Sequence, residues 1–279
     1  MICFKKQLIS SIALLNLIAS AALGAQSATL FLPSNITLET VQEKKESHDI
    51  EFAFDIHDVI LTNNTQKRFQ TAYEFPNKLS LFKVFLKPML ILTCLSLVAQ
   101  LIIDAIPIVR DYIPHEDITG ERFVVLFEQA DEPELAQLVI NISNCYDLNP
   151  AVATIIGDLK SQNYPLRIAS NIGKTVFLQL QKELATKDEN IFMLFDADDQ
   201  DRLGKVIDYN SSGTVLPKPH AEFFKEYQAM YNPDGTKLII FVDDKDKNIQ
   251  QAVTHGFVGI HFINAEQLRA DLVELGIES

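Results

Sequence analysis

Acidic side chains stand at the ends of two predicted strands, where a carboxylate can attack a substrate or bind a metal ion. Asp55 lies near the end of the alternating run Ile50 to Ile56, and Asp243 and Asp244 follow the apolar run Lys237 to Val242. Aspartate is depleted in strands, although an aspartate that caps a turn is an ordinary finding. Adjacent carboxylates repel each other unless a cation holds them, and their oxygens suit Mg²⁺.

Two further motifs carry groups that could bind an anion. Ser170 and Asn171 follow the short predicted strand Leu166 to Ala169, where a hydroxyl and exposed amides can hold an oxyanion or cap a helix. Lys218 precedes a helix predicted from Pro219 to Tyr231, because proline suits the first helical position. A cation there opposes the helix dipole, so Lys218 either neutralises a phosphate or carboxylate or is a solvated surface lysine.

The elements that must position these residues alternate between strand and helix from Leu166 onward. This pattern predicts a doubly wound, Rossmann-like parallel α/β sheet, and ligands bind such sheets at the carboxyl ends of the strands. We predict the later strands at Ile191 to Phe195 and Val258 to Phe262, and the later helices at Lys174 to Leu184, Asn248 to His255 and Ala265 to Leu275.

The stretch from Leu61 to Pro165 does not show this strand–helix alternation. It predicts a mainly helical insertion after the first strand. Prolines punctuate several segments, and Asn149 followed by Pro150 marks the start of one helix. Pro88 to Ile103 contains 16 residues without charge, roughly 24 Å as a helix, which is short for a bilayer core of about 30 Å. We expect a buried or peripheral helix there, with docking on a membrane surface as the alternative.

Taken in order, the four motifs resemble those of the haloacid dehalogenase-like (HAD) hydrolase superfamily, over about Ile50 to Phe262. The insertion stands where that family carries its first-type cap. The resemblance divides the chain from residue 50 onward into a HAD-like core (50–66 and 161–279) and a helical cap (67–160). The pattern of the preceding residues predicts a signal peptide (1–24) and a linker (25–49).

The resemblance also implies a role for each motif residue. Asp55 would be the nucleophile that forms an aspartyl-phosphate, and Lys218 would offset the negative charge of nucleophile and phosphate. Ser170 and the backbone of Asn171 would hold the phosphoryl oxygens of a small phosphorylated substrate. Mg²⁺ would be bound by the side chains of Asp55 and Asp243 and the backbone carbonyl of His57, with Asp244 supporting the metal site.

The motif departs from the family pattern at His57, where phosphatases usually carry a second aspartate as acid and base. Imidazole can do this work near neutral pH, although a protonated histidine beside Mg²⁺ is disfavoured by repulsion. Asp58 could act instead, or turnover could be slow or lost. Three functions stay open: a Mg²⁺-dependent phosphatase, a catalytically degenerate binding module that contacts a membrane or protein through its apolar cap, and a dehalogenase.

Composition and the first residues set the broader frame. An apolar fraction of 47% excludes a disordered chain, and three cysteines exclude a disulfide scaffold, although Cys94 and Cys145 could pair or stay free. A net charge of −13 and a pI near 4.9 exclude a nucleic-acid backbone as a partner.

Lys5 and Lys6, followed by an apolar run and small residues, predict an export signal cut before Ala25, or alternatively an uncleaved membrane anchor. Its removal takes the net charge from −13 to −15.

Overall fold

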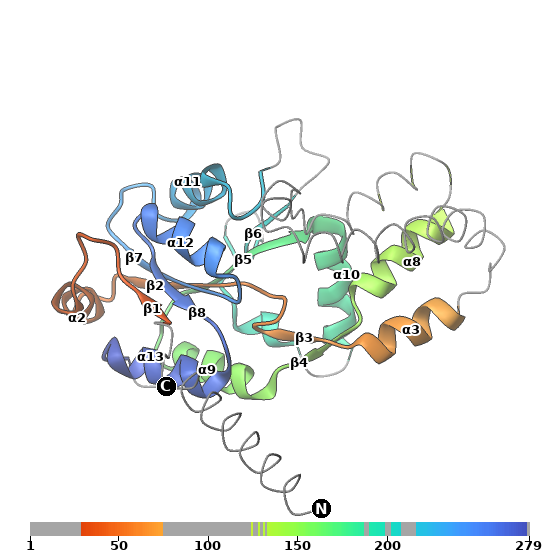
Figure 1. The fold of residues 1–279 in the computed structure, drawn as a ribbon, viewed down its shortest axis with the longest axis horizontal. Helices are drawn as coiled ribbons and strands as arrows, with labels where there is room; N and C mark the ends of the chain where they lie inside the picture. The colour runs from red at the N-terminus through yellow and green to blue at the C-terminus, as the bar shows by residue number, and fades with distance from the viewer. Residues whose placement is uncertain are drawn as a thin grey trace, which may run out of the picture.

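A six-stranded sheet forms the centre of the computed structural model, which describes residues 29–74, 124, 128, 131, 133–186, 190–198, 202–207 and 216–277 (Figure 1). The strand order is β1-β8-β7-β2-β5-β6, and all neighbours are parallel except β1 and β8. The strands are β1 (Leu30–Phe31), β2 (Ile50–Phe54), β5 (Leu166–Gly173), β6 (Gly204–Ile207), β7 (Leu238–Asp243) and β8 (Val258–His261). The predicted α/β class and Rossmann-like sheet are therefore confirmed.

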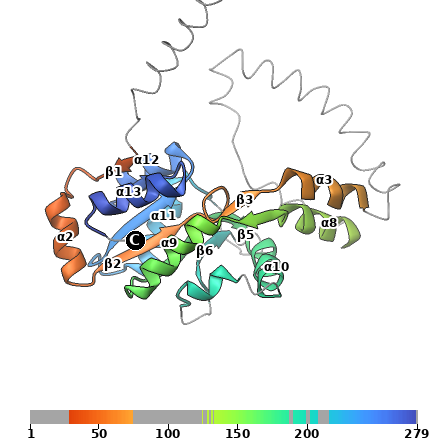
Figure 2. The ribbon, with the colours of Figure 1, turned by 90° about the horizontal axis from the view of Figure 1, so that it is seen from below.

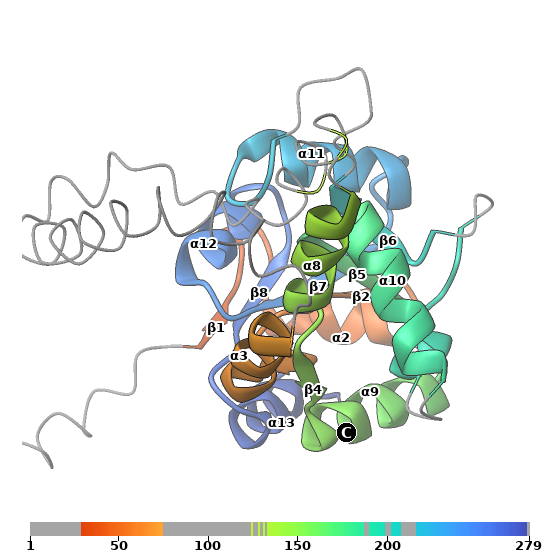
Figure 3. The same cartoon turned by 90° about the vertical axis from the view of Figure 1, so that its right-hand side faces the viewer.

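Helices cover both faces of this sheet because successive strand residues point to opposite sides. Phe52 and Phe54 of β2 belong to the core shared with α9 (Pro150–Ser161) and α13 (Ala265–Glu274). Ala53 between them belongs to the core on the other face, with α11 (Ala221–Tyr231) and α12 (Asp246–Thr254). Figure 3 shows the three layers, with α11 and α12 above the strands and α9 and α13 below.

The inserted region leaves the sheet through a two-stranded ribbon that the sequence did not predict. In it β3 (Leu61–Asn63) pairs antiparallel with β4 (Tyr146–Leu148). Beyond the ribbon, α3 (Thr65–Glu74) packs against α8 (Pro133–Ser143), and both project away from the sheet (Figures 1 and 2). Because each strand of the ribbon directly adjoins one of these helices, the ribbon determines where they stand relative to the sheet.

The chain returns to the sheet domain earlier than the predicted cap boundary at residue 160. Helix α9 begins at Pro150, as predicted, and the Asn149 side chain accepts a hydrogen bond from the Val152 amide at 3.4 Å. Its apolar face packs beside α13 and against η2 (Ile191–Leu194), a short 3₁₀ helix. Helix α9 therefore covers the sheet, because its buried face is continuous with the sheet core.

The described part of the segment predicted as a linker, residues 29–49, also belongs to the sheet domain. Leu30 of β1 pairs with Ile260 of β8, and α2 (Leu38–Glu46) follows with Thr37 as its N-cap. The sequence concealed both elements for physical reasons. Strand β1 has only two residues, and α2 buries only Val41, so neither shows apolar periodicity.

The predicted strand from Ile191 to Phe195 was wrong, because Ile191–Leu194 forms η2. A short apolar run does not by itself distinguish strand from helix, and here Met193 is 77% exposed. The next strand of the sheet is β6, which begins at Gly204 with φ +154. A Cβ at this position would lie 2.0 Å from the Ile168 carbonyl oxygen, so the pairing of β6 with β5 requires glycine here.

Several sequence predictions fall outside the described residues. These are the signal peptide, the apolar run Pro88 to Ile103, and any pairing of Cys94 with Cys145. Within the described ranges, we found no helix with the length and apolar character needed to cross a bilayer.

Candidate active site

Two carboxylates and one ammonium group meet at the carboxyl ends of neighbouring strands β2 and β7. The Lys218 Nζ atom lies 3.2 Å from the Asp55 carboxylate and 2.6 Å from the Asp243 carboxylate. It also donates to the Ala169 carbonyl at 2.7 Å, so each of its three N–H groups has an acceptor. All three charged side chains are buried, and the structure thus assembles the predicted nucleophile, lysine and metal ligand in one place.

The charges of this cluster hold Asp55 ionised. Burial by itself would raise the pKa of Asp55, but Lys218, His57 and hydrogen bonds from Ser170 and the Ile56 amide bring this pKa below its ordinary value. Burial would likewise lower the pKa of Lys218, and the two carboxylates raise it above the usual value instead. The pair is therefore a carboxylate beside an ammonium at neutral pH.

Asp243 and Asp244 carry excess negative charge that one lysine does not neutralise. Burial, and after it the charge of Asp55, raises the pKa of Asp243 to about 6. Burial, followed by the charges of Asp243 and Asp55, raises the pKa of Asp244 to about 7. Oxygens of Asp55, Asp243 and Asp244 lie within 4.8 Å of one another. Three oxygen ligands that repel each other fit a divalent cation such as Mg²⁺.

Ser170 and Asn171 lie within β5 rather than after its end. The pairing of β5 with β6 shifts its register between Ala169 and Gly173, so this part of the strand is irregular. The Asn171 side chain accepts from the Lys218 amide at 2.8 Å and donates to the Lys218 carbonyl at 3.0 Å. It therefore fixes the segment that carries the lysine, a role that sequence reasoning did not assign.

The helix expected from Pro219 begins instead at Ala221, with His220 as its N-cap. The His220 amide donates to the Pro217 carbonyl at 2.8 Å, so a turn separates Lys218 from the helix. The argument from the helix dipole was therefore wrong in its geometry. Lys218 is positioned by Asn171 and by its own acceptors.

Two residues that follow β7 in sequence support the segment that carries Asp243 and Asp244. Asn248 donates to both oxygens of Asp243, at 2.9 and 3.0 Å. His261, at the end of β8, lies with its Nε2 atom 3.0 Å from the Asp244 carbonyl oxygen. These contacts, together with that of the Lys245 amide to Asp243 at 2.8 Å, hold the loop after β7 in one conformation.

No family model and no curated protein matches the sequence. A predicted HAD-like family hydrolase from Porphyromonas gingivalis, 17% identical, matches 83% of this chain and 100% of its own with a TM-score of 0.50. The chain has the HAD-like fold. The chain is also similar, with a lower TM-score of 0.44, to the L-2-haloacid dehalogenase of Xanthobacter autotrophicus. The two are 16% identical, and the match covers 83% of this chain and 84% of the dehalogenase. A HAD family enzyme of Bacteroides thetaiotaomicron, solved with magnesium and inorganic phosphate, is 14% identical and has a TM-score of 0.40. The match covers 75% of this chain and 91% of that enzyme.

Within this HAD-like fold, the half-buried His57 lies close enough to Asp55 for their charges to interact. Its imidazole stacks on the Tyr146 ring with centroids 4.6 Å apart and planes at 25°. Burial lowers the pKa of His57, although Asp55 and Asp58 raise it. Its Nε2 atom is buried and has no hydrogen-bond partner among the described residues. The imidazole is therefore neutral at pH 7.

Asp58 is a weaker candidate for acid–base work in this HAD-like site. It is exposed and lines a cavity of about 520 Å³ whose lining includes neither Asp55 nor Lys218. Its backbone has φ 59, the left-handed region, and its amide donates to the Leu61 carbonyl at 2.7 Å. Its conformation thus serves a tight turn that leads into the ribbon.

Tyr146 and Arg68 are the site residues that sequence reasoning missed. Arg68 donates to the Tyr146 hydroxyl at 2.6 Å and lies over the tyrosine ring, 4.9 Å from its centroid. Arg68 thereby supports the ring on which His57 stacks. No sequence signal marks this link, because its parts are 78 positions apart and meet only through the β3–β4 ribbon.

Proposed function

We propose that this protein is a Mg²⁺-dependent, phosphatase-type hydrolase that acts through an aspartyl-phosphate on Asp55. One observation carries the proposal: an ionised, buried Asp55 touches Lys218 and shares a small space with two carboxylates of raised pKa. Carboxylates at this spacing repel one another, and a divalent cation between them would relieve that repulsion. The proposed substrate is a small phosphomonoester.

The donor set fits a hard divalent cation. Asp55, Asp243 and Asp244 would hold Mg²⁺ together with the backbone carbonyl of His57. When bound, the ion would supply positive charge against the phosphoryl oxygens and the three carboxylates.

In the first step, the Asp55 oxygen forms a bond to phosphorus while the bond from phosphorus to the leaving oxygen breaks. Lys218 stays protonated and lies against the nucleophile, where it reduces repulsion between carboxylate and phosphate. With substrate bound, the backbone amide of Asn171 and the Ser170 hydroxyl, which donates to Asp55 in this structure, would donate to the phosphoryl oxygens. The chain thus provides donors where negative charge accumulates.

In the second step, water attacks the aspartyl-phosphate and the bond between phosphorus and Asp55 breaks. The water proton passes to the unpartnered Nε2 atom of neutral His57. Because its lowered pKa keeps His57 neutral at pH 7, the ring can accept a proton but holds no imidazolium proton to give to the leaving oxygen. We therefore expect aryl phosphates, whose leaving oxygens need no proton, to react faster than alkyl phosphates.

The test is hydrolysis of a panel of aryl and alkyl phosphomonoesters with Mg²⁺ by the wild type, Asp55→Asn and His57→Ala. The proposal requires loss of turnover in Asp55→Asn and slow release of phosphate from a trapped aspartyl-phosphate in His57→Ala. Equal rates for the wild type and Asp55→Asn would disprove it. Lys225→Met, at an exposed position of α11, provides a control for surface charge changes.

Export through residues 1–24 remains part of this proposal, and a membrane contact through Pro88 to Ile103 remains the alternative to a buried or peripheral helix there. Both rest on the sequence alone. Fractionation of cells that express the full chain, with and without Lys5→Ser and Lys6→Ser, tests the first. Flotation with vesicles of neutral and anionic lipid tests the second.

A further inference from the structure

The His57 imidazole rests on an aromatic ring that comes from the insertion. Its plane lies at 25° to the plane of the Tyr146 ring, with the two centroids 4.6 Å apart, and Tyr146 belongs to β4 of the ribbon. The Nε2 atom of His57 has no hydrogen-bond partner among the described residues. The last side-chain torsion of a histidine has broad preferences, so a contact with the face of the ring is needed to fix its plane. Stacking on Tyr146 supplies that contact.

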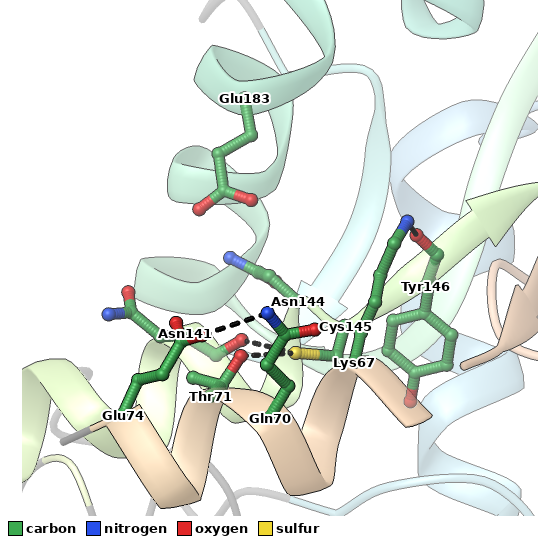
Figure 4. A pocket seen from close by; sticks show the side chains of 9 residues that line it. All are labelled: Lys67, Gln70, Thr71, Glu74, Asn141, Asn144, Cys145, Tyr146 and Glu183. Atoms are coloured by element: carbon green, nitrogen blue, oxygen red, sulfur yellow. Dashed lines mark hydrogen bonds between the residues drawn. The ribbon is translucent and has the colours of Figure 1, made fainter. Parts of the chain in front are cut away.

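Tyr146 is itself held at both of its ends. Its backbone pairs with Asn63 across the ribbon, and its amide donates to the Asn144 carbonyl at 2.9 Å. At the other end, Arg68 of α3 donates to the hydroxyl at 2.6 Å, and its guanidinium lies 4.9 Å from the ring centroid. Figure 4 shows the tyrosine at the edge of the side chains that line a cleft between α3 and α10 (Lys174–Ala185). The insertion therefore fixes the surface against which the imidazole stacks.

Resting on the function proposed above, we propose that Tyr146 is a positioning residue that acts through His57 in the second step of the reaction and is kept in place by Arg68. Tyr146 exchanges no proton. It fixes the imidazole plane, so that Nε2 can take the proton while the water oxygen bonds to phosphorus and the bond from phosphorus to Asp55 breaks. The first step, which depends on Asp55 and Lys218, does not need this contact.

This division between the two steps distinguishes a positioning residue from one that only supports the fold. With an aryl phosphate such as 4-nitrophenyl phosphate, kcat/KM covers the steps up to release of the aryl oxide, whereas kcat also includes hydrolysis of the aspartyl-phosphate. Tyr146→Leu should therefore lower kcat and KM together, by about tenfold, and leave kcat/KM and the rate of the first-turnover burst unchanged. A fall in kcat/KM as large as the fall in kcat would overturn the inference.

Two further variants divide the contact into its parts. Tyr146→Phe keeps the ring and loses the hydroxyl that Arg68 holds, so its kcat should lie between those of the wild type and Tyr146→Leu. Arg68→Met should resemble Tyr146→Phe. The matched control is Arg269→Met, because Arg269 lies on α13 and pairs with Asp158 at 3.4 Å. Thermal melts establish that each variant folds.

A double-mutant cycle tests whether Tyr146 acts through the imidazole. In the His57→Ala background, Tyr146→Leu should not lower kcat further, because no ring is left to position. If the two losses multiply in the double variant, Tyr146 acts on the substrate or on the fold, and the inference is overturned.

NMR of the metal-free protein separates this inference from the proposed function, because it needs no turnover. The carbon-bound ring protons of His57, identified by their loss in His57→Ala, should shift downfield in Tyr146→Leu, where they lose the ring current of the stacked tyrosine. Tyr146→Phe should keep most of the wild-type shift. Signals that do not move in Tyr146→Leu overturn the inference, as does Asp55-dependent turnover with an unchanged kcat in that variant, and both leave the function standing. Signals that move, without Asp55-dependent turnover, disprove the function and support the positioning of the ring.

Discussion

Asn171 and Lys218 are joined by two reciprocal hydrogen bonds between the asparagine side chain and the lysine backbone, of 2.8 and 3.0 Å. The lysine ammonium then contacts both Asp55 and Asp243. A side chain of β5 thus positions a charge that acts at β2 and β7. The residues of the four motifs form one connected network.

Asn171→Ala should lower kcat/KM by about 10- to 100-fold, because a displacement of Lys218 by about 1 Å is enough for such a loss. The ammonium itself is retained, so the protein should still fold. Steady-state kinetics and a thermal melt check both statements. Unchanged kinetics would mean that the carboxylates alone position Lys218.

Lys218→Met should abolish turnover and lower the free energy of unfolding by about 3 kcal/mol at pH 8, because two buried carboxylates lose their cation. The loss should shrink at pH 5. Without lysine, the pKa of Asp243 rises further above its unfolded value, so the folded state takes up protons that the unfolded state does not and gains stability as the pH falls. Urea unfolding at the two pH values measures this, with Lys225→Met as the exposed control. A loss that is equal at both would contradict the electrostatic explanation.

Asp244→Asn should stabilise the metal-free protein at pH 8 and have little effect at pH 5. The pKa of Asp244 is about 7 in the folded chain, against about 3.9 in a model peptide. From roughly pH 4 to pH 7 the folded state therefore binds more protons than the unfolded state, and the unfolding free energy falls as pH rises. Thermal melts should show a higher Tm for the variant at pH 8, and saturating Mg²⁺ should remove or reverse the difference, since the ion stabilises the ionised wild type. A variant less stable than the metal-free wild type at pH 8 would contradict this account.

Asp58→Gly should leave stability within about 0.5 kcal/mol, whereas Asp58→Val should cost at least about 1 kcal/mol, because φ 59 is disfavoured for a β-branched residue. Both variants should keep most of their turnover if His57 is the base. Chemical unfolding and phosphatase assays on the pair measure the two effects. A large loss of rate in Asp58→Gly, with unchanged stability, would transfer the acid–base role from His57 to Asp58.

The sequence predicted the sheet and the carboxylates at its strand ends where strong patterns recur. The run ending at Val242 is buried throughout, and Asp243 follows it, so the strand and its terminal carboxylate were predicted together. Asn149 and Pro150 similarly marked the start of α9. These signals are local, because each combines a residue with the element it begins or ends.

The parts that the sequence concealed depend on contacts between distant residues. Arg68, Tyr146 and His57 come together only when the β3–β4 ribbon forms, and nothing in their neighbours announces it. The position of Lys218 was predicted from a helix start that the structure replaces with a turn. Short or polar elements such as β1 and α2 lacked an apolar period to reveal them.

Strand β1 bears on the order in which the protein can be completed during synthesis. Leu30 and Phe31 pair with Ile260 and Gly259, and Thr29 donates a hydrogen bond to Asp271, 242 positions away. The first strand of the sheet therefore has no partner until nearly the whole chain has been made. Until then β8 is absent, and Leu30 and Phe31 have no strand to pair with.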